Sequence, residues 1–470
     1  MRRLAVFATL LFIIISCTSE TDDVNPFITY LNNTVEDYEY ELVSNIEGDG
    51  YEAYIIRMVS QHWLTEQDVN ETEWWHWLTI VVPDEVEHQT GFLWIGGGTS
   101  NDDLPDEVNA LVKEAALATN SITADLHNVP NQPLTFLDDE RMDQRYEDDL
   151  IAYGWLKFLE GGAKTEDADW LSRYPMTTAA IRAMDTITNF SSNELSLDVH
   201  EFVVSGASKR GWTAWYTAIF DDRVKAVAPA VIDLLNMTPS FQHHWRAYGE
   251  WSPAIREYEN EQIMDWQFST EYKRLTQLVD PYSYLSQLDI PKYIINAASD
   301  EFFLPDSWQF YWDDLPGEKY LRYIPNTGHS ISETDAPFSL ISFYNKIINN
   351  QTVPDYSWKA SAEGYQIQFD PDNLPDEVLL WSAHNPDDRD FRLYVIDRIW
   401  LAEDVEIQED GSAHIELSIP SEGFTAWFVE ATFGIDSPLP FKKTTGVVVT
   451  PDEYPFPEFT LENPLGTIAE

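Results

Sequence analysis

The stretch Phe202-Val203-Val204-Ser205-Gly206-Ala207-Ser208-Lys209-Arg210-Gly211 decides the fold of this 470-residue chain. Its first residues are typical of a buried strand, and an amphipathic helix pattern runs from Lys209 to Phe220. The small residues before Ser208 leave room for a strained turn that pushes its hydroxyl clear of a sheet. We therefore expect Ser208 to be a nucleophile, with the Lys209 amide stabilising an oxyanion. A tight turn selected only for packing is the alternative.

A serine nucleophile needs a base and an acid that orients the base. Asp300 follows a predicted strand at Lys292–Ala297, and His329 follows another at Tyr320–Ile324. Both therefore lie at strand C-termini, where open α/β sheets build their sites. The order Ser, Asp, His is that of α/β-hydrolases, so the sequence predicts a triad of Ser208, Asp300 and His329.

Two other carboxylates compete with Asp300 for the role of the acid. Asp233 follows the predicted strand Val224–Ala228, a position that some α/β-hydrolases use, and Glu301 is next to Asp300. Among the ten histidines, only His329 lies in the right loop. His243 and His244 are expected on the surface of a cap or in contact with substrate.

A second oxyanion donor is expected after the predicted strand Phe92–Ile95. Gly96-Gly97-Gly98 follows it directly, and we assign the donor amides to Gly97 and Gly98. The alternative is a plain turn at the end of a strand. No Gly-Lys-Ser/Thr follows, which disfavours a phosphate loop. No cluster has metal-ligand spacing, so we predict neither metal nor cofactor.

The chain alternates strand and helix patterns as far as about residue 350, which predicts a mainly parallel sheet. Aromatic-rich helical sequence at about 234–288 interrupts the alternation and predicts a cap. Residues 18–350 are thus expected to form an α/β-hydrolase domain with a helical cap insertion. Short alternating segments, among them Thr444–Val449, predict an all-β, sandwich-like accessory domain at 355–457.

The first residues have the features of an export signal. Arg2 and Arg3 precede an apolar run at Leu4–Ile15 that is too short to span a bilayer. The run ends at Ile14-Ile15-Ser16-Cys17, which resembles a bacterial lipobox, and Cys17 is the only cysteine. Residues 1–17 are therefore predicted to be a lipoprotein signal peptide. Lipidation at Cys17 would anchor an exported protein, and Thr18 after it favours the outer membrane.

The charge is strongly acidic, with 81 acidic residues against 28 basic ones and a formal net charge of −53. Because the acids are spread along the whole chain, they favour a surface adapted to high salt. Attraction of a cationic partner or substrate is the alternative. No basic stripe is available for a phosphate backbone, which disfavours nucleic-acid binding. The sequence does not indicate an oligomeric state.

Four stretches resemble the PhoPQ-activated pathogenicity-related family: Trp77–Pro83, Trp94–Gly98, Gly206–Thr213 and Ala298–Phe303. The similarity covers roughly residues 25–350. It implies an α/β-hydrolase-like fold, an envelope or secreted location, and an association with virulence and resistance to antimicrobial peptides. The elbow departs from Gly-x-Ser-x-Gly because Arg210 stands where a glycine is usual, and Gly211 follows. This Gly-x-Ser-x-x-Gly pattern resembles the elbow of glucuronoyl esterases.

The residues are most consistent with an exported serine hydrolase that cleaves an ester or peptide bond in a small-molecule substrate. A serine exopeptidase that acts on peptide N-termini is the sharper alternative. The third possibility is a non-catalytic envelope protein that binds a ligand through the cap and the β-rich region. In each case the membrane is contacted only through the lipid anchor.

Overall fold

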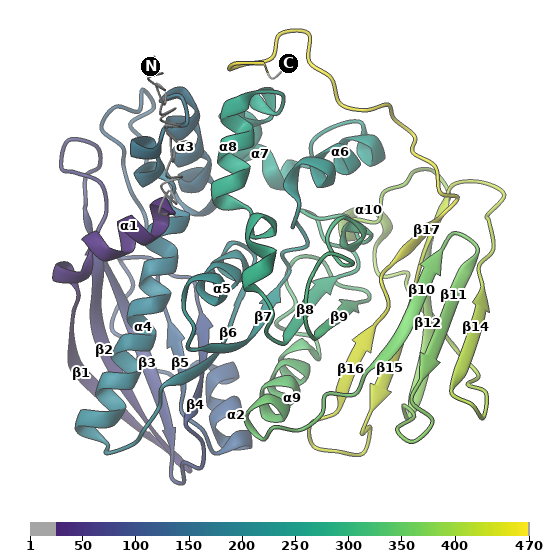
Figure 1. Ribbon diagram of the computed structural model, residues 1–470, viewed down its shortest axis with the longest axis horizontal. Helices are drawn as coiled ribbons and strands as arrows, with labels where there is room; N and C mark the ends of the chain where they lie inside the picture. The colour runs from purple at the N-terminus through teal and green to yellow at the C-terminus, as the bar shows by residue number, and fades with distance from the viewer. Residues whose placement is uncertain (1–24, 469–470) are drawn as a thin grey trace, which may run out of the picture.

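The computed structural model describes residues 25–468, so the predicted signal peptide and Cys17 lie outside the described residues. Its centre is a 9-stranded sheet with the strand order β1-β2-β3-β5-β4-β6-β7-β8-β9 (Figure 1). These strands are β1 (Glu39–Gly48), β2 (Tyr51–His62), β3 (Glu73–Pro83), β4 (Thr90–Ile95), β5 (Thr123–Leu126), β6 (Glu201–Ala207), β7 (Val224–Ala230), β8 (Lys292–Ala297) and β9 (Lys319–Ile324).

The strand pairing in the sheet changes from antiparallel on the β1 side to parallel on the β9 side. β1, β2 and β3 pair antiparallel, β3 pairs antiparallel with β5, and all pairs from β5 across to β9 are parallel. The first strand, β1, is largely exposed and was not predicted, because its polar sequence lacks the apolar run of a buried strand. The parallel strands β4, β6, β7, β8 and β9 were predicted, since their sequences are largely apolar and suit burial on both faces.

The strand order reverses at β4, whose neighbours are β5 on one side and β6 on the other. In open α/β sheets, ligands bind in the crevice beyond the strand C-termini at such a reversal. The loop after β4 contains Gly97, and the turn after β6 contains Ser208. The topology alone therefore brings the predicted oxyanion loop and the predicted nucleophile to one crevice.

Helices cover both faces of the sheet, and the buried apolar residues accordingly form two clusters. One cluster contains residues of α2 (Ala110–Thr119) and α9 (Ala336–Ile348). The other holds residues of α1 (Pro26–Asn33), α3 (Glu147–Glu160), α4 (Arg173–Glu194) and α5 (Lys209–Phe220). The predicted α/β-hydrolase fold is thereby confirmed. Within residues 25–468, no helix combines the length and apolarity needed to cross a bilayer.

The predicted insertion consists of short helices above one end of the sheet (Figure 1). They include α6 (Met237–Tyr248), α7 (Arg256–Asn260) and α8 (Thr270–Val279), joined by 3-10 turns. We refer to residues 234–288 as the cap. Its aromatic residues belong to the same buried cluster as α3 and α5, so the cap packs on the core rather than standing apart from it.

After α9 the chain forms two antiparallel sheets, in agreement with the predicted C-terminal β structure. One sheet joins β10 (Tyr356–Ser361), β11 (Gly364–Phe369) and β14 (Ser412–Glu416). The other joins β12 (Glu377–Asn385), β13 (Leu401–Asp404), β15 (Phe424–Phe433) and β16 (Phe441–Thr444), with β17 (Val448–Thr450) paired to β15. The prediction of one strand over Thr444–Val449 was wrong. The chain leaves the sheet at Gly446, where a Cβ would lie 2.1 Å from the Trp308 ring.

The last described residues return to the cap, as the yellow segment that runs above α6 toward the upper end of α8 in Figure 1 shows. The amide of Phe456 donates to the backbone carbonyl of Arg246 at 3.1 Å, and that of Leu465 donates to the backbone carbonyl of Asp265 at 2.8 Å. The Phe459 ring packs against Trp245, with ring centroids 4.7 Å apart. Nothing in the sequence pattern predicts this return, which ties the end of the chain to the cap.

Candidate active site

The turn after β6 has the strained backbone that a nucleophile elbow requires. Ser208 has φ 58° and ψ −127°, a conformation that side-chain-bearing residues rarely adopt. Its amide donates to the carbonyl of Ala230 on β7 at 2.8 Å, which holds the turn at the end of the sheet. The Ser208 hydroxyl makes no hydrogen bond to any described residue. The side chain is therefore available to a ligand at the crevice.

The displaced glycine of the elbow has a packing reason. A Cβ on Gly211 would lie 2.9 Å from the carbonyl oxygen of Gly206 and 3.0 Å from that of Ala230. A Cβ on Gly206 would in turn lie 2.7 Å from the carbonyl oxygen of Arg210. The two glycines thus let α5 start directly against β6 and β7. Because the close contacts fall on Gly206 and Gly211, position 210 does not need to be glycine and can carry the long side chain of Arg210.

Asp300 and His329 meet beyond the ends of β8 and β9. The Nδ1 atom of His329 lies 2.9 Å from Oδ2 and 3.0 Å from Oδ1 of Asp300. The carboxylate is buried and also accepts the backbone N–H of Phe302 at 2.7 Å. The Phe302 ring packs on the imidazole, with centroids 4.2 Å apart. The other ring nitrogen, Nε2, is buried and has no hydrogen-bond partner among the described residues.

Neither competing carboxylate contacts the His329 ring. Asp233 is fully buried and accepts hydrogen bonds from Tyr311 at 2.6 Å and Tyr323 at 2.5 Å. Burial raises the pKa of Asp233 to about 7, although the two tyrosine hydroxyls act in the opposite direction. Glu301 accepts the backbone N–H of His329 at 2.7 Å. Asp233 is thus a buried acid bound to two tyrosines. Glu301 binds the backbone of the loop after β9 that contains His329, which we call the histidine loop.

The predicted oxyanion donors flank the elbow. The Lys209 amide is the first of α5, where amides have no carbonyl partner within the helix. Gly97 lies in the loop after β4, and a Cβ there would lie 3.0 Å from Nη2 of Arg210. Gly98 has φ +121°, which favours glycine. Within residues 25–468, the amides of Gly97 and Gly98 donate no backbone hydrogen bond, so both remain available for an oxyanion.

The basic residues after Ser208 are neutralised by α3. The ammonium of Lys209 lies 2.8 Å from Glu147 and 2.9 Å from Asp148. Arg210 pairs with the other oxygen of Glu147 at 2.5 Å and donates to the carbonyl of Val129 at 2.6 Å. Burial would raise the pKa of Glu147, but Lys209 and Arg210 outweigh it and hold the pKa at about 2. The elbow is thereby fixed to the start of α3.

Two cavities meet at Ser208. The larger has a volume of about 710 Å³ and is lined by Ser208, Gly97 and His329. The smaller is about 40 Å³, lies under the cap, and is also lined by Ser208. Phe302 borders both cavities. A substrate in the larger cavity could therefore place one small group in the smaller one.

Of the two cap histidines, His243 lies elsewhere than predicted. His243 is buried rather than at the cap surface. Its Nε2 lies 2.7 Å from Asp306, and its Nδ1 lies 2.8 Å from the hydroxyl of Tyr454. His243 thus joins the cap to the C-terminal segment and to the loop after β8 that contains Asp300, which we call the acid loop. The expectation of a surface or substrate-contacting residue was therefore wrong for His243. His244 lines the smaller cavity, and burial lowers its pKa to about 3.

The β-rich region supports the site through residues that the sequence did not reveal. The Trp400 indole donates to the hydroxyl of Ser299 at 2.9 Å, directly before Asp300. Asn326, three residues before His329, exchanges two hydrogen bonds with the Trp400 backbone at 2.9 and 3.0 Å. One tryptophan therefore orders both the acid loop and the histidine loop. No motif could have marked it, because the contact joins residues about a hundred positions apart.

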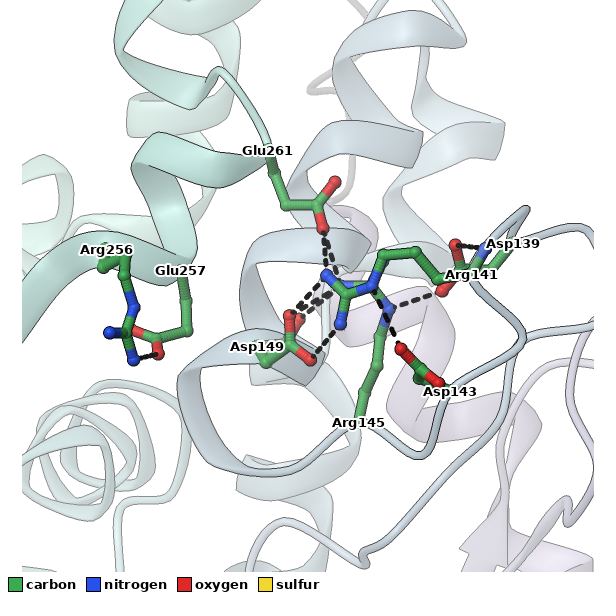
Figure 2. Close-up of polar contacts among 8 residues, drawn as sticks. All are labelled: Asp139, Arg141, Asp143, Arg145, Asp149, Arg256, Glu257 and Glu261. Atoms are coloured by element: carbon green, nitrogen blue, oxygen red, sulfur yellow. Dashed lines mark hydrogen bonds and ion pairs between the residues drawn. The ribbon is translucent and has the colours of Figure 1, made fainter.

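An ion-pair cluster fastens the cap to the core next to the site (Figure 2). Arg145, whose side chain is 1% exposed, lies 2.8 Å from Asp139, 2.7 Å from Asp149 and 2.7 Å from Glu261 of the cap. Arg141 adds contacts to Asp149 at 3.0 Å and to Glu261 at 3.3 Å. Because Asp149 is in the first turn of α3, the cluster links the cap to the helix that also holds Lys209.

Comparison with known proteins identifies the family. The family model described as PhoPQ-activated pathogenicity-related protein matches residues 28–392. The chain belongs to this family. A relative, the Autocrine proliferation repressor protein A of Dictyostelium discoideum, is 34% identical over an alignment 459 residues long, which covers 92% of this chain and 91% of the relative. The predicted resemblance is thereby confirmed, and the relative shows that it extends into the β-rich region.

Several solved structures resemble this family member at low identity. Acetyl xylan esterase 1 from Thermoanaerobacterium sp. JW/SL YS485 is 14% identical with a TM-score of 0.48, over 68% of this chain and 93% of the esterase. The glucuronoyl esterase from Solibacter usitatus is 13% identical with a TM-score of 0.41, over 71% and 93%. The acylaminoacyl peptidase of Pyrococcus horikoshii is 11% identical with a TM-score of 0.41, over 67% and 51%. At these values the activities in the three names are properties of those proteins alone.

Proposed function

We propose that this protein is a serine hydrolase that cleaves an ester bond through an acyl-enzyme, with Ser208 as nucleophile, His329 as base and Asp300 as the orienting acid. The observation that carries the proposal is the His329–Asp300 contact at 2.9 Å beside the cavity that Ser208 also lines. A strained elbow has a cost in folding free energy, and such strain is typically found at functional sites.

The chemistry follows from the roles of the three side chains. The Oγ of Ser208 attacks the carbonyl carbon, and Nε2 of His329 accepts its proton. The carbonyl electrons move to the oxygen, which the amides of Lys209 and of Gly97 or Gly98 stabilise. His329 then protonates the leaving group as the bond to carbon breaks. A water molecule repeats the sequence on the acyl-enzyme, releasing an acid and restoring Ser208.

An ester is favoured over a peptide N-terminus because of how the nearby carboxylates are used. An exopeptidase of that kind binds a free amine with carboxylates next to the nucleophile. Here Glu147 and Asp148 are already paired with Lys209, and Glu147 also with Arg210. Asp148 accepts a further hydrogen bond from Tyr258 at 3.0 Å. No carboxylate in this group is left for a substrate amine, which makes the exopeptidase the second candidate.

The proposal extends to the location of the enzyme. The basic start, the apolar run and Cys17 support export and lipid anchoring, with the enzyme at the outer membrane. A non-catalytic binding protein remains the competing function. It does not account for a histidine with one nitrogen on a buried carboxylate and the other buried without a partner.

The test compares esters with amides. Hydrolysis of 4-nitrophenyl acetate and butyrate is measured beside that of aminoacyl and dipeptidyl 4-nitroanilides, for the wild type and for Ser208→Ala. Ser205→Ala is the matched control, since Ser205 is buried in β6, three residues before Ser208. We expect ester hydrolysis that Ser208→Ala abolishes and Ser205→Ala retains. Preferred cleavage of the anilides would favour the exopeptidase, and no turnover of either class would favour the binding protein.

A further inference from the structure

The smaller cavity beside Ser208 is lined largely by apolar side chains but also by the buried cation Arg173. Several of the lining residues are aromatic: Trp155, Trp212, Phe241, Tyr258, Phe302 and Phe303. Its volume of about 40 Å³ is room for a few water molecules or one small substituent. Arg173, the first residue of α4, also lines it and is 2% exposed.

Arg173 is buried without a carboxylate partner among the described residues. Its Nη1 donates to the carbonyl of Lys209 at 2.9 Å, and its guanidinium lies 4.5 Å from the centroid of the Trp212 ring. Its Nε is buried and has no hydrogen-bond partner. Most buried arginines of this chain are ion-paired, such as Arg145 and Arg389. Arg173 therefore differs from them in lining a cavity without an ion pair.

The charges around the cavity leave one positive charge in excess. Lys209 and Arg210 are balanced by Glu147 and Asp148 through direct ion pairs. Asp148 also lines the cavity, but it makes no ion pair with Arg173 and attracts it only at longer range. His244, which also lines the cavity, contributes no charge near neutral pH because burial lowers its pKa to about 3. An unpaired buried charge destabilises a folded protein, so a bound anion would compensate the charge of Arg173.

We infer that Arg173 binds a carboxylate of the substrate in this cavity, so that the preferred substrates are esters bearing a second, free carboxylate. A guanidinium suits this task because its planar donors match the two oxygens of a carboxylate. The aromatic wall excludes water and strengthens the pair. The inference rests on the proposed function, because it uses Ser208 as the reacting group. The carboxylate can belong to the acyl group or to the leaving group, and both bring the same chemistry to Arg173.

The experiment measures preference for charge at matched size. The first arm compares mono-4-nitrophenyl esters of glutaric, adipic and pimelic acid with the 4-nitrophenyl esters of pentanoic, hexanoic and heptanoic acid. The second arm compares 3-(butanoyloxy)benzoate with phenyl butanoate. The rate with Ser208→Ala is subtracted as the blank, because some monoesters hydrolyse themselves. We expect the wild type to prefer the charged member by about 10- to 100-fold in kcat/KM in one arm, which is the range of one charge-assisted hydrogen bond.

Variants then assign the preference to Arg173. Arg173→Gln should reduce the ratio of charged to neutral substrate to about one, and Arg173→Lys should keep part of it. Arg182→Gln is the matched control, because Arg182 is a buried arginine of the same helix that pairs with Asp185, away from the cavity. It should leave the ratio as in the wild type. The ratio separates substrate binding from a structural role, since loss of folded enzyme lowers both rates equally.

The outcomes separate this inference from the proposed function. Equal rates for charged and neutral esters in both arms of the wild type would overturn the role of Arg173 and leave the hydrolase intact. A preference that survives in Arg173→Gln would also overturn it. If Arg173→Gln does not fold, the wild-type ratio and Arg173→Lys still decide the matter. No hydrolysis of any ester by the wild type would instead contradict the proposed function.

Discussion

Replacing Asp300 by Asn should nearly abolish hydrolysis while leaving the fold in place. Both carboxylate oxygens of Asp300 lie at 2.9 and 3.0 Å from Nδ1 of His329. An asparagine can keep the hydrogen bond from the Phe302 backbone through its carbonyl oxygen. Its NH₂ group then faces Nδ1, which moves the ring proton to Nε2. A protonated Nε2 cannot accept the proton of Ser208.

The magnitude follows from the loss of the base and of the charge that stabilises the imidazolium. This change lowers kcat by about 10³- to 10⁴-fold in a Ser-His-Asp triad of known mechanism. The assay is kcat/KM for the best ester, with thermal melting to verify the fold. Asp233→Asn is the matched control, because Asp233 is a buried acid after the neighbouring strand that contacts tyrosines instead of His329. It should change kcat less than about tenfold. A loss below tenfold in Asp300→Asn, or an equal loss in Asp233→Asn, would refute this assignment of the acid.

Further predictions concern stability. Gly211→Ala places a Cβ 2.9 Å from a backbone oxygen and should lower stability by about 1–3 kcal/mol, seen as a lower Tm. Arg145→Gln leaves buried carboxylates unpaired and should cost about 3–5 kcal/mol, whereas an unchanged Tm would contradict the role of the cluster in Figure 2. The pKa of Asp233 is raised to about 7, so its protonated form stabilises the fold below pH 4, and this stabilisation is lost as pH rises through 7. The free energy of unfolding should therefore fall over this pH range by up to about 4 kcal/mol less in Asp233→Asn than in the wild type. An identical pH dependence of the two proteins would contradict this prediction. With a net charge of −53, the Tm should rise between low and half-molar salt.

The sequence predicts the parallel half of the sheet and the elbow because those features are local. β8 begins and ends at the predicted residues, and α5 runs from Lys209 to Phe220 as expected. Apolar runs, small turn residues and a 3.6-residue stripe determine such elements without reference to distant contacts. Ser208, Asp300 and His329 each follow a parallel strand, and the C-terminal ends of parallel strands lie at one edge of the sheet.

The features that could not be predicted depend on contacts between distant residues. β1 is a polar edge strand that exists because β2 offers it a hydrogen-bonding partner. Trp400 reaches Ser299 and Asn326 only after the β-rich region has folded. Arg173 resembles any helical arginine until its burial and lack of an ion pair are known. The residues proposed to react are therefore predictable from the sequence, whereas the residues that support them and line the cavities are not.

The most direct test of the central claim is covalent labelling of the wild-type protein with a fluorophosphonate. The probe bonds to a serine hydroxyl whose proton a neighbouring base can remove, which is the state proposed for Ser208 beside His329. Intact-mass measurement should show one probe per chain, located by peptide mapping on the segment that contains Ser208. Ser208→Ala should remove the label and Ser205→Ala should retain it. An unlabelled wild type, or a label that persists in a folded Ser208→Ala variant, would contradict the claim.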